Sequence, residues 1–206
     1  MPLSEVGEKI FEALKHEGVF LHTTKHGLNL TKKSVMVFRY CGDGKKSADK
    51  LGHHKSICDE IGIGIHHLGT NGGAMWIAEH PKMVAAFPRH FSSTYPKPEM
   101  DLDEIMQSCG PDIQDTDNVG VEGHGPCGIA RAAGMTVLDV VWCIVEARRK
   151  ILERDPTLKV VAYYHVELPN EMCTYVIDAK RFMEIYDTLA MKVERWARER
   201  YATEVQ

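Results

Sequence analysis

Apolar residues recur along the chain with two alternating periods, one typical of helices and one typical of strands. Helical spacing predicts helices over four stretches, at 4–18, 46–62, 136–155 and 179–201. Runs rich in β-branched and aromatic residues predict strands over five stretches, at 34–41, 63–69, 118–123, 159–168 and 173–178. The last two strands are joined by the short stretch "PNE", which predicts a hairpin.

Strands separated by helices predict an α/β fold. We expect a central, mostly parallel β-sheet flanked by helices, with a C-terminal hairpin at the edge of the sheet and a terminal helix. The chain has 206 residues, of which 44% are hydrophobic, and that is enough to bury a full core in one domain over 1–206. The polar, proline-bearing stretch from about 81 to 117 predicts an insertion into this domain.

The charge and hydropathy of the chain indicate which partners and which cellular location to expect. The formal net charge is −4, and basic residues do not cluster, so we expect neither nucleic acid nor a membrane surface as a partner. The first ten residues carry charges where a signal peptide would have its apolar segment, and the longest apolar stretch, 136–147, contains Asp139. We therefore expect a cytoplasmic protein.

Candidate chemistry gathers where three predicted parallel strands end, the place where ligands bind in such sheets. The turns that follow these strands read "CGDGK", "GTNGGA" and "GHGPCG". Six cysteines are too sparse for a disulfide framework, so thiols in these turns are candidate ligands. Cys41, His124 and Cys127 offer two thiolates and one imidazole, which suits a tetrahedral Zn²⁺ with one position left open.

The order of these motifs resembles the β-class carbonic anhydrases. The resemblance rests on a strand that ends in Cys-x-Asp, a glycine-rich turn after the next strand, and a strand that ends in Gly-His-x-x-Cys-Gly. It implies that Cys41, His124 and Cys127 bind zinc and that Asp43 is the carboxylate beside the metal. Where the family has an arginine to hold that carboxylate, this chain has Lys45. The resemblance also implies a homo-oligomer, a dimer or larger.

These expectations lead to one principal function, the zinc-dependent hydration of CO₂ (or of a relative such as COS or CS₂) to bicarbonate. Zinc makes hydroxide available near neutral pH, and Asp43 can accept its proton if a cation keeps the carboxylate ionised. Lys45 supplies charge but lacks the two-pronged hydrogen bonding of arginine, so Asp43 is free to swing onto the metal. The alternative is therefore a catalytically silent relative in which zinc is structural.

Other interpretations remain open. "GHGPCG" also matches the Gly-x-Gly-x-x-Gly dinucleotide turn, although an acidic residue at the expected distance is missing. A nucleophilic Cys127 would need an arginine that closes a phosphate loop, and Arg131 comes too early for that. We expect structural roles for the pairs His53/His54 and His66/His67, because adjacent side chains point apart and at most one of each pair can face a site.

Overall fold

In the computed structural model of this protein, the described residues are 3–22, 35–41, 47–70, 72–91, 102–103, 105–107, 117–168 and 172–204. Within them, six strands form one sheet in the order β1-β6-β5-β4-β2-β3. The strands are β1 (Phe20–His22), β2 (Val35–Cys41), β3 (Gly64–Thr70), β4 (Asn118–Gly125), β5 (Lys159–Glu167) and β6 (Met172–Ile177).

The centre of the sheet is parallel, as the sequence predicts. β2 lies between β3 and β4 and runs parallel to both, and β4 is parallel to β5. β5 and β6 form the predicted antiparallel hairpin. The α/β fold with its mostly parallel sheet is therefore confirmed, and the three motif-bearing strands are neighbours in space.

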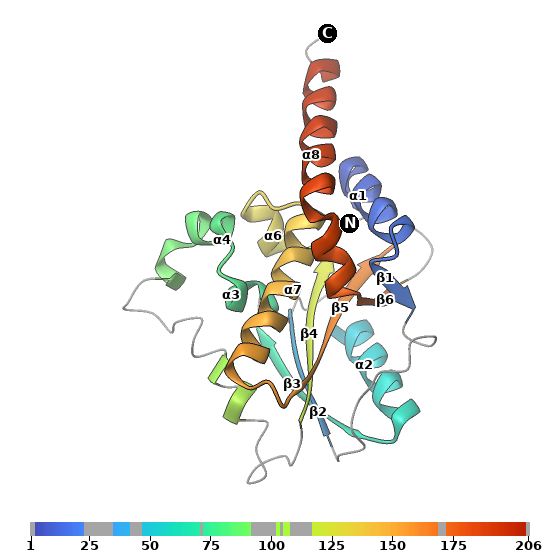
Figure 1. The fold of residues 1–206 in the computed structure, drawn as a ribbon, viewed down its shortest axis with the longest axis vertical. Helices are drawn as coiled ribbons and strands as arrows, with labels where there is room; N and C mark the ends of the chain where they lie inside the picture. Colours follow the sequence, from blue (N-terminus) through green and yellow to red (C-terminus); the bar gives the residue numbers. More distant parts are fainter. Residues whose placement is uncertain are drawn as a thin grey trace.

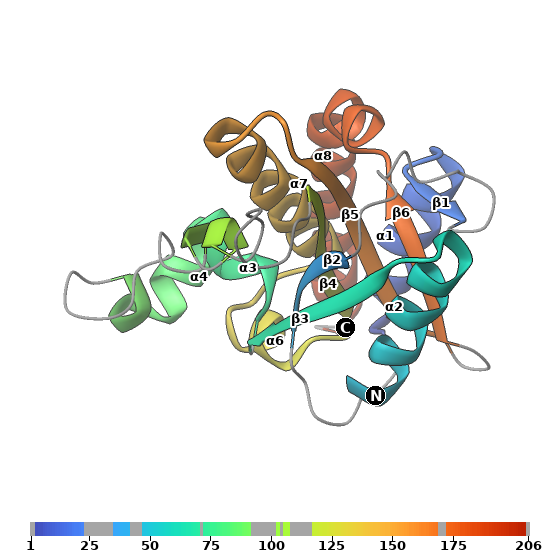
Figure 2. The ribbon, with the colours of Figure 1, turned by 90° about the horizontal axis from the view of Figure 1, so that it is seen from below.

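Helices cover both faces of the sheet. They are α1 (Glu5–His16), α2 (Ser47–Ile61), α3 (Ala74–Ala78), α4 (Pro81–Ala86), α6 (Gly128–Ala132), α7 (Val137–Arg154) and α8 (Ala179–Glu204), with a 3₁₀ turn η1 at Pro88–Phe91. In Figures 1 and 2, α1, α7 and α8 lie on one face and α2 lies on the other. The sheet is thus a middle layer between helices on its two faces.

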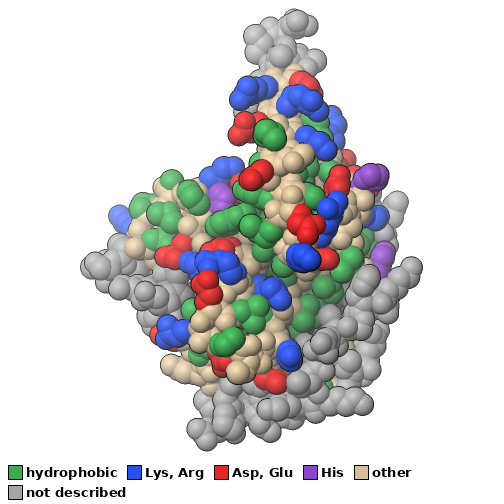
Figure 3. All heavy atoms as spheres, viewed as in Figure 1, with side chains coloured by type: hydrophobic (Ala, Val, Ile, Leu, Met, Phe, Trp, Pro, Cys, Tyr) green, Lys and Arg blue, Asp and Glu red, His purple; other side chains and the backbone are tan. Residues whose placement is uncertain are grey.

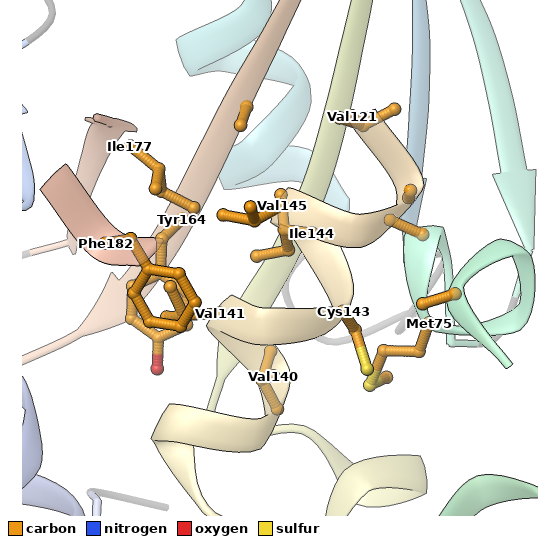
Figure 4. Packing of buried hydrophobic residues seen from close by; sticks show 14 of the residues in the cluster. Met75, Val121, Val140, Val141, Cys143, Ile144, Val145, Tyr164, Ile177 and Phe182 are labelled. Carbon is orange, nitrogen blue, oxygen red and sulfur yellow. The ribbon is translucent and has the colours of Figure 1, made fainter. Parts of the chain in front are cut away.

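The larger core lies between the sheet and α7. This helix begins at a capping box, in which Thr136 and Asp139 satisfy each other's backbone N–H groups. Val141 and Ile144 are fully buried, and Figure 4 shows them packed beside Tyr164 and Phe182. Such close packing holds the ends of β4 and β5 at fixed positions.

Two features differ from or extend the sequence prediction. β1 was not predicted, because three residues are too few to show a period; it pairs antiparallel with β6. The stretch 81–117, predicted as an insertion, begins with α4 and η1, and Ile105 within it is fully buried in the larger core.

α8 extends well beyond the sheet in Figure 1 and carries charges of both signs along its outer part in Figure 3. Its first half packs on the core through Phe182 and Leu189. Among the described residues, helices with the length and apolar character needed to cross a bilayer are absent.

Candidate metal centre

The fold brings Cys41, His124 and Cys127 together. Cys41 is the last residue of β2, and β4 runs beside β2 in a register that pairs Arg39 with Val121. The two strands therefore deliver Cys41 and His124 to the same edge of the sheet, and the turn after β4 returns Cys127 to it. The Sγ atoms of both cysteines and a ring nitrogen of His124 all lie within 4.8 Å of one another.

All three side chains are buried, and the imidazole is poised for a ligand. His124 is 0% exposed, and neither Nδ1 nor Nε2 has a hydrogen-bond partner in the described structure. An unpaired buried polar group is costly, typically about 1–3 kcal/mol. A metal ion bound to one ring nitrogen would remove part of that cost.

The turn after β3 contacts Cys41 through Gly72 and Gly73. The backbone N–H of Gly72 donates a hydrogen bond of 3.1 Å to Cys41 Sγ. Gly73 follows with a φ of +52°, and a Cβ there would lie 2.6 Å from the backbone nitrogen of Cys41. Because only glycine fits so close an approach, Gly73 allows the turn after β3 to pack against the ends of β2 and β4.

The side chains of Cys41 and Cys127 are hydrogen-bonded to each other, and this bond moves their pKa values in opposite directions. The hydrogen bond with Cys127 lowers the pKa of Cys41 to about 4, against the effect of burial, with help from His124 and the Gly72 N–H. The same hydrogen bond, together with burial and the charge of Cys41, raises the pKa of Cys127. A cation that binds both sulfurs would displace the remaining proton.

Two thiolates and one imidazole form a donor set that fits zinc. Zn–S and Zn–N bonds of about 2.3 and 2.0 Å in a tetrahedron are compatible with the separations between these three side chains. Three ligands from the described residues leave a fourth position, and three protein ligands with a fourth position open are typical of catalytic rather than closed structural zinc sites. Cys41, His124 and Cys127 are the residues that would hold the ion.

Asp43 and Lys45, the two predicted catalytic residues, lie outside the described residues. Asp43 follows the ligand Cys41 by two positions in the chain, and Lys45 follows it by four. Their roles therefore stay predictions from the sequence.

A buried polar chain lies on the α2 face of the sheet, and the sequence did not lead us to expect it. His54 Nε2 donates to Glu122 Oε2 at 2.5 Å, and His54 Nδ1 lies 3.4 Å from Nε2 of His67. The rings of Phe38 and His54 stack with centroids 4.0 Å apart. His54 and Glu122 are both fully buried.

The histidines behave partly as expected. One member of each pair, His54 and His67, faces the shared cluster, in agreement with the alternation rule. Burial lowers the pKa of His67 to about 4, so its ring is neutral near pH 7. The sequence does contain one signal for this cluster: Glu122 is a charged residue inside an otherwise apolar buried strand, where it needs a buried partner.

A cavity of about 460 Å³ opens beside His124 and Cys127, two of the three candidate ligands. His124 and Cys127 line it from the end of β4, and Ile10 of α1 and Val140 of α7 line its other sides. Most of the lining is apolar. Two of the three candidate ligands thus border this mostly apolar space.

A functional assignment for this chain rests on the α/β sheet and the buried Cys-His-Cys triad, because the comparisons with known proteins add nothing to them. The chain matches no protein-family model, no curated protein and no solved structure.

Proposed function

We propose that this protein is a zinc-dependent lyase that hydrates CO₂ to bicarbonate, as the resemblance of its motifs to β-class carbonic anhydrases suggests. The observation that carries the proposal is the triad itself: two buried thiols and a buried imidazole without a hydrogen-bond partner among the described residues, gathered within 4.8 Å of one another beside an apolar cavity. CO₂ is small and apolar, so it suits such a cavity. COS and CS₂ are substrates of the same class.

Zinc, when bound, supplies hydroxide near neutral pH by lowering the pKa of a water molecule. The overall reaction joins a water oxygen to the carbon of CO₂, opens one C=O π bond and releases one proton. Two thiolates neutralise the charge of the ion, so we expect a mildly alkaline optimum. The hydrogen bond from Gly72 to Cys41 tempers the charge of that thiolate and fixes its orientation.

Asp43 and Lys45 keep the roles that the resemblance implies. Asp43 accepts the proton of the attacking water, and Lys45 keeps Asp43 ionised. A lysine holds a carboxylate at one point only, whereas an arginine holds it at two. We therefore expect Lys45→Arg to raise activity at neutral pH, and Asp43→Ala to lower it across the pH range.

The test is CO₂ hydration followed by stopped flow on purified, zinc-loaded protein from neutral to alkaline pH. We expect activity that rises on the alkaline side and disappears in Cys41→Ala and His124→Ala. Wild-type protein with one zinc per chain and no hydration above the buffer rate at any pH would contradict the proposal. That result would support the second candidate, a protein in which the metal joins the ends of β2 and β4 and has no catalytic role.

A further inference from the structure

The cavity beside the candidate metal centre contains a buried group that the proposed reaction does not yet use. Its floor is formed by β4 and β5, and α1 and the residues before it cover it through Ile10 and Leu3. Tyr164 of β5 also lines it. The ring of Tyr164 stacks on Phe20 at a centroid distance of 5.1 Å, with 8° between the planes, so its position is fixed.

The Tyr164 hydroxyl has no hydrogen-bond partner among the described residues, although the side chain is 0% exposed. It lies close against the backbone beside the ligands, because a Cβ on Gly125 would be only 2.0 Å from Oη. Gly125 is the neighbour of His124 in β4. Glycine at this position therefore leaves room for the phenol to reach the end of β4.

Burial and the nearby charge of Cys127 raise the pKa of the Tyr164 phenol well above its usual value. The group therefore remains an O–H donor at any working pH. A buried donor without an acceptor costs about 1–3 kcal/mol, and a ligand oxygen in the cavity would remove that cost.

The size of the cavity explains why such a donor is needed. A space of about 460 Å³ with mostly apolar walls gives a triatomic molecule no fixed orientation. One well-placed polar group in an apolar pocket commonly supplies it. For CO₂, a hydrogen bond to one oxygen also draws electrons away from the carbon that is attacked.

We propose that the cavity between α1 and the end of β4 is the substrate site and that the Tyr164 hydroxyl donates a hydrogen bond to an oxygen of CO₂. This inference rests on the proposed function. It assigns Tyr164 to substrate contact, and it assigns α1 the role of covering the substrate. The neighbouring Tyr163 has no such role, because it lies in the smaller core with Phe38, on the other face of the sheet.

Tyr164→Phe tests the proposal, with Tyr163→Phe as the matched control. Both hydroxyls are buried without a partner in the described structure, so both variants lose the same group from a similar environment. Zinc content and melting temperature are expected to match or exceed those of the wild type in both. Only Tyr164→Phe should lower kcat/KM for CO₂, by about tenfold, which is the equivalent of one hydrogen bond.

A second readout is independent of turnover. In crystals of the zinc-loaded protein pressurised with CO₂, density for a linear molecule is expected within hydrogen-bond distance of Tyr164 Oη, and it should be weaker or displaced in Tyr164→Phe. An active wild type with unchanged kcat/KM in Tyr164→Phe, or an equal loss in Tyr163→Phe, would overturn the assignment of Tyr164 alone. A zinc-loaded wild type without hydration activity would instead overturn the proposed function, and this inference with it.

Discussion

Gly73 lies against Cys41 so closely that a Cβ on the glycine would be 2.6 Å from the backbone nitrogen of the cysteine. The same Cβ would be 3.0 Å from the carbonyl oxygen of Glu122. One residue of the turn after β3 thus touches both strands that carry the candidate ligands Cys41 and His124. The glycine sets the distance between this turn and Cys41, and with it the hydrogen bond from Gly72.

Gly73→Ala is therefore expected to damage the centre. The added methyl meets backbone on two strands and must also adopt a φ of +52°, so we expect a loss of about 2–4 kcal/mol in unfolding free energy and weaker zinc binding. Gly52→Ala is the control, because a Cβ at this exposed position of α2 meets nothing within 4 Å. That change should stabilise the protein by about 0.5–1 kcal/mol. Urea unfolding and zinc titration of both variants make the comparison, and equal behaviour would contradict the role of Gly73.

The metal content should depend on all three ligands. Purified protein is expected to contain about one zinc per chain, and alanine at Cys41, His124 or Cys127 should remove it. Cys143→Ala serves as the control, since this thiol is equally buried but packs in the core of α7 beside Met75 (Figure 4). Elemental analysis by mass spectrometry measures the result. Full zinc in Cys41→Ala would show that the two strands do not share a site.

The buried pair of His54 and Glu122 should be strongly coupled. Each alanine variant removes a short, fully buried hydrogen bond from the partner that remains, so each is expected to lose about 3–5 kcal/mol. The double variant should lose less than the sum of the two, by about 1–3 kcal/mol. Urea unfolding of the wild type and the three variants gives this coupling energy. Additive losses would mean that the hydrogen bond contributes nothing of its own.

Asp139 should make stability depend on pH. Burial by itself raises the pKa of this carboxyl, but hydrogen bonds from His80, Lys82 and the Thr136 N–H outweigh burial and lower the pKa overall. A lowered folded-state pKa gives stability that is present above the unfolded value of about 3.9 and is lost as pH falls below it.

Asp139→Asn is thus expected to cost about 1–3 kcal/mol at neutral pH, and the difference from the wild type should shrink below about pH 4. Glu153→Gln, an exposed acid on the same helix, should change stability by less than about 1 kcal/mol. Urea unfolding at several pH values tests both. A difference for Asp139→Asn that stays constant or grows in acid would be the contrary result.

The resemblance also leads us to expect a dimer or a larger homo-oligomer. Phe11 and Leu14, on the apolar face of α1, are buried in the core of the same chain, so a second copy is not needed to cover this face. Met183 and Met191 of α8 are 56% and 66% exposed and are better placed for contact with a second copy. Sedimentation velocity at micromolar concentration measures the state. A monomer with full activity would contradict the expected homo-oligomer.

Much of the fold follows from the order of residues alone. The helical period of apolar residues predicted the long helices, because each of them buries one side over several turns. Runs of β-branched and aromatic residues predicted the central strands and the hairpin, because a strand covered on both faces is apolar along most of its length. The motifs at the strand ends predicted that Cys41, His124 and Cys127 lie together, since the carboxyl ends of adjacent parallel strands meet at one edge. β1, with three residues, was too short to carry such a signal.

The surroundings of the ligands, in contrast, depend on tertiary packing. Whether a side chain lacks a partner within the described part of the chain, as His124 and Tyr164 do, depends on every element packed around it, and the local sequence does not contain that information. The contact of Gly73 with Cys41 and the pairing of His54 with Glu122 join residues that are far apart in the chain, the second pair by 68 positions. Such contacts arise from how the sheet, α2 and the turn after β3 pack together, and packing is a property of the whole fold.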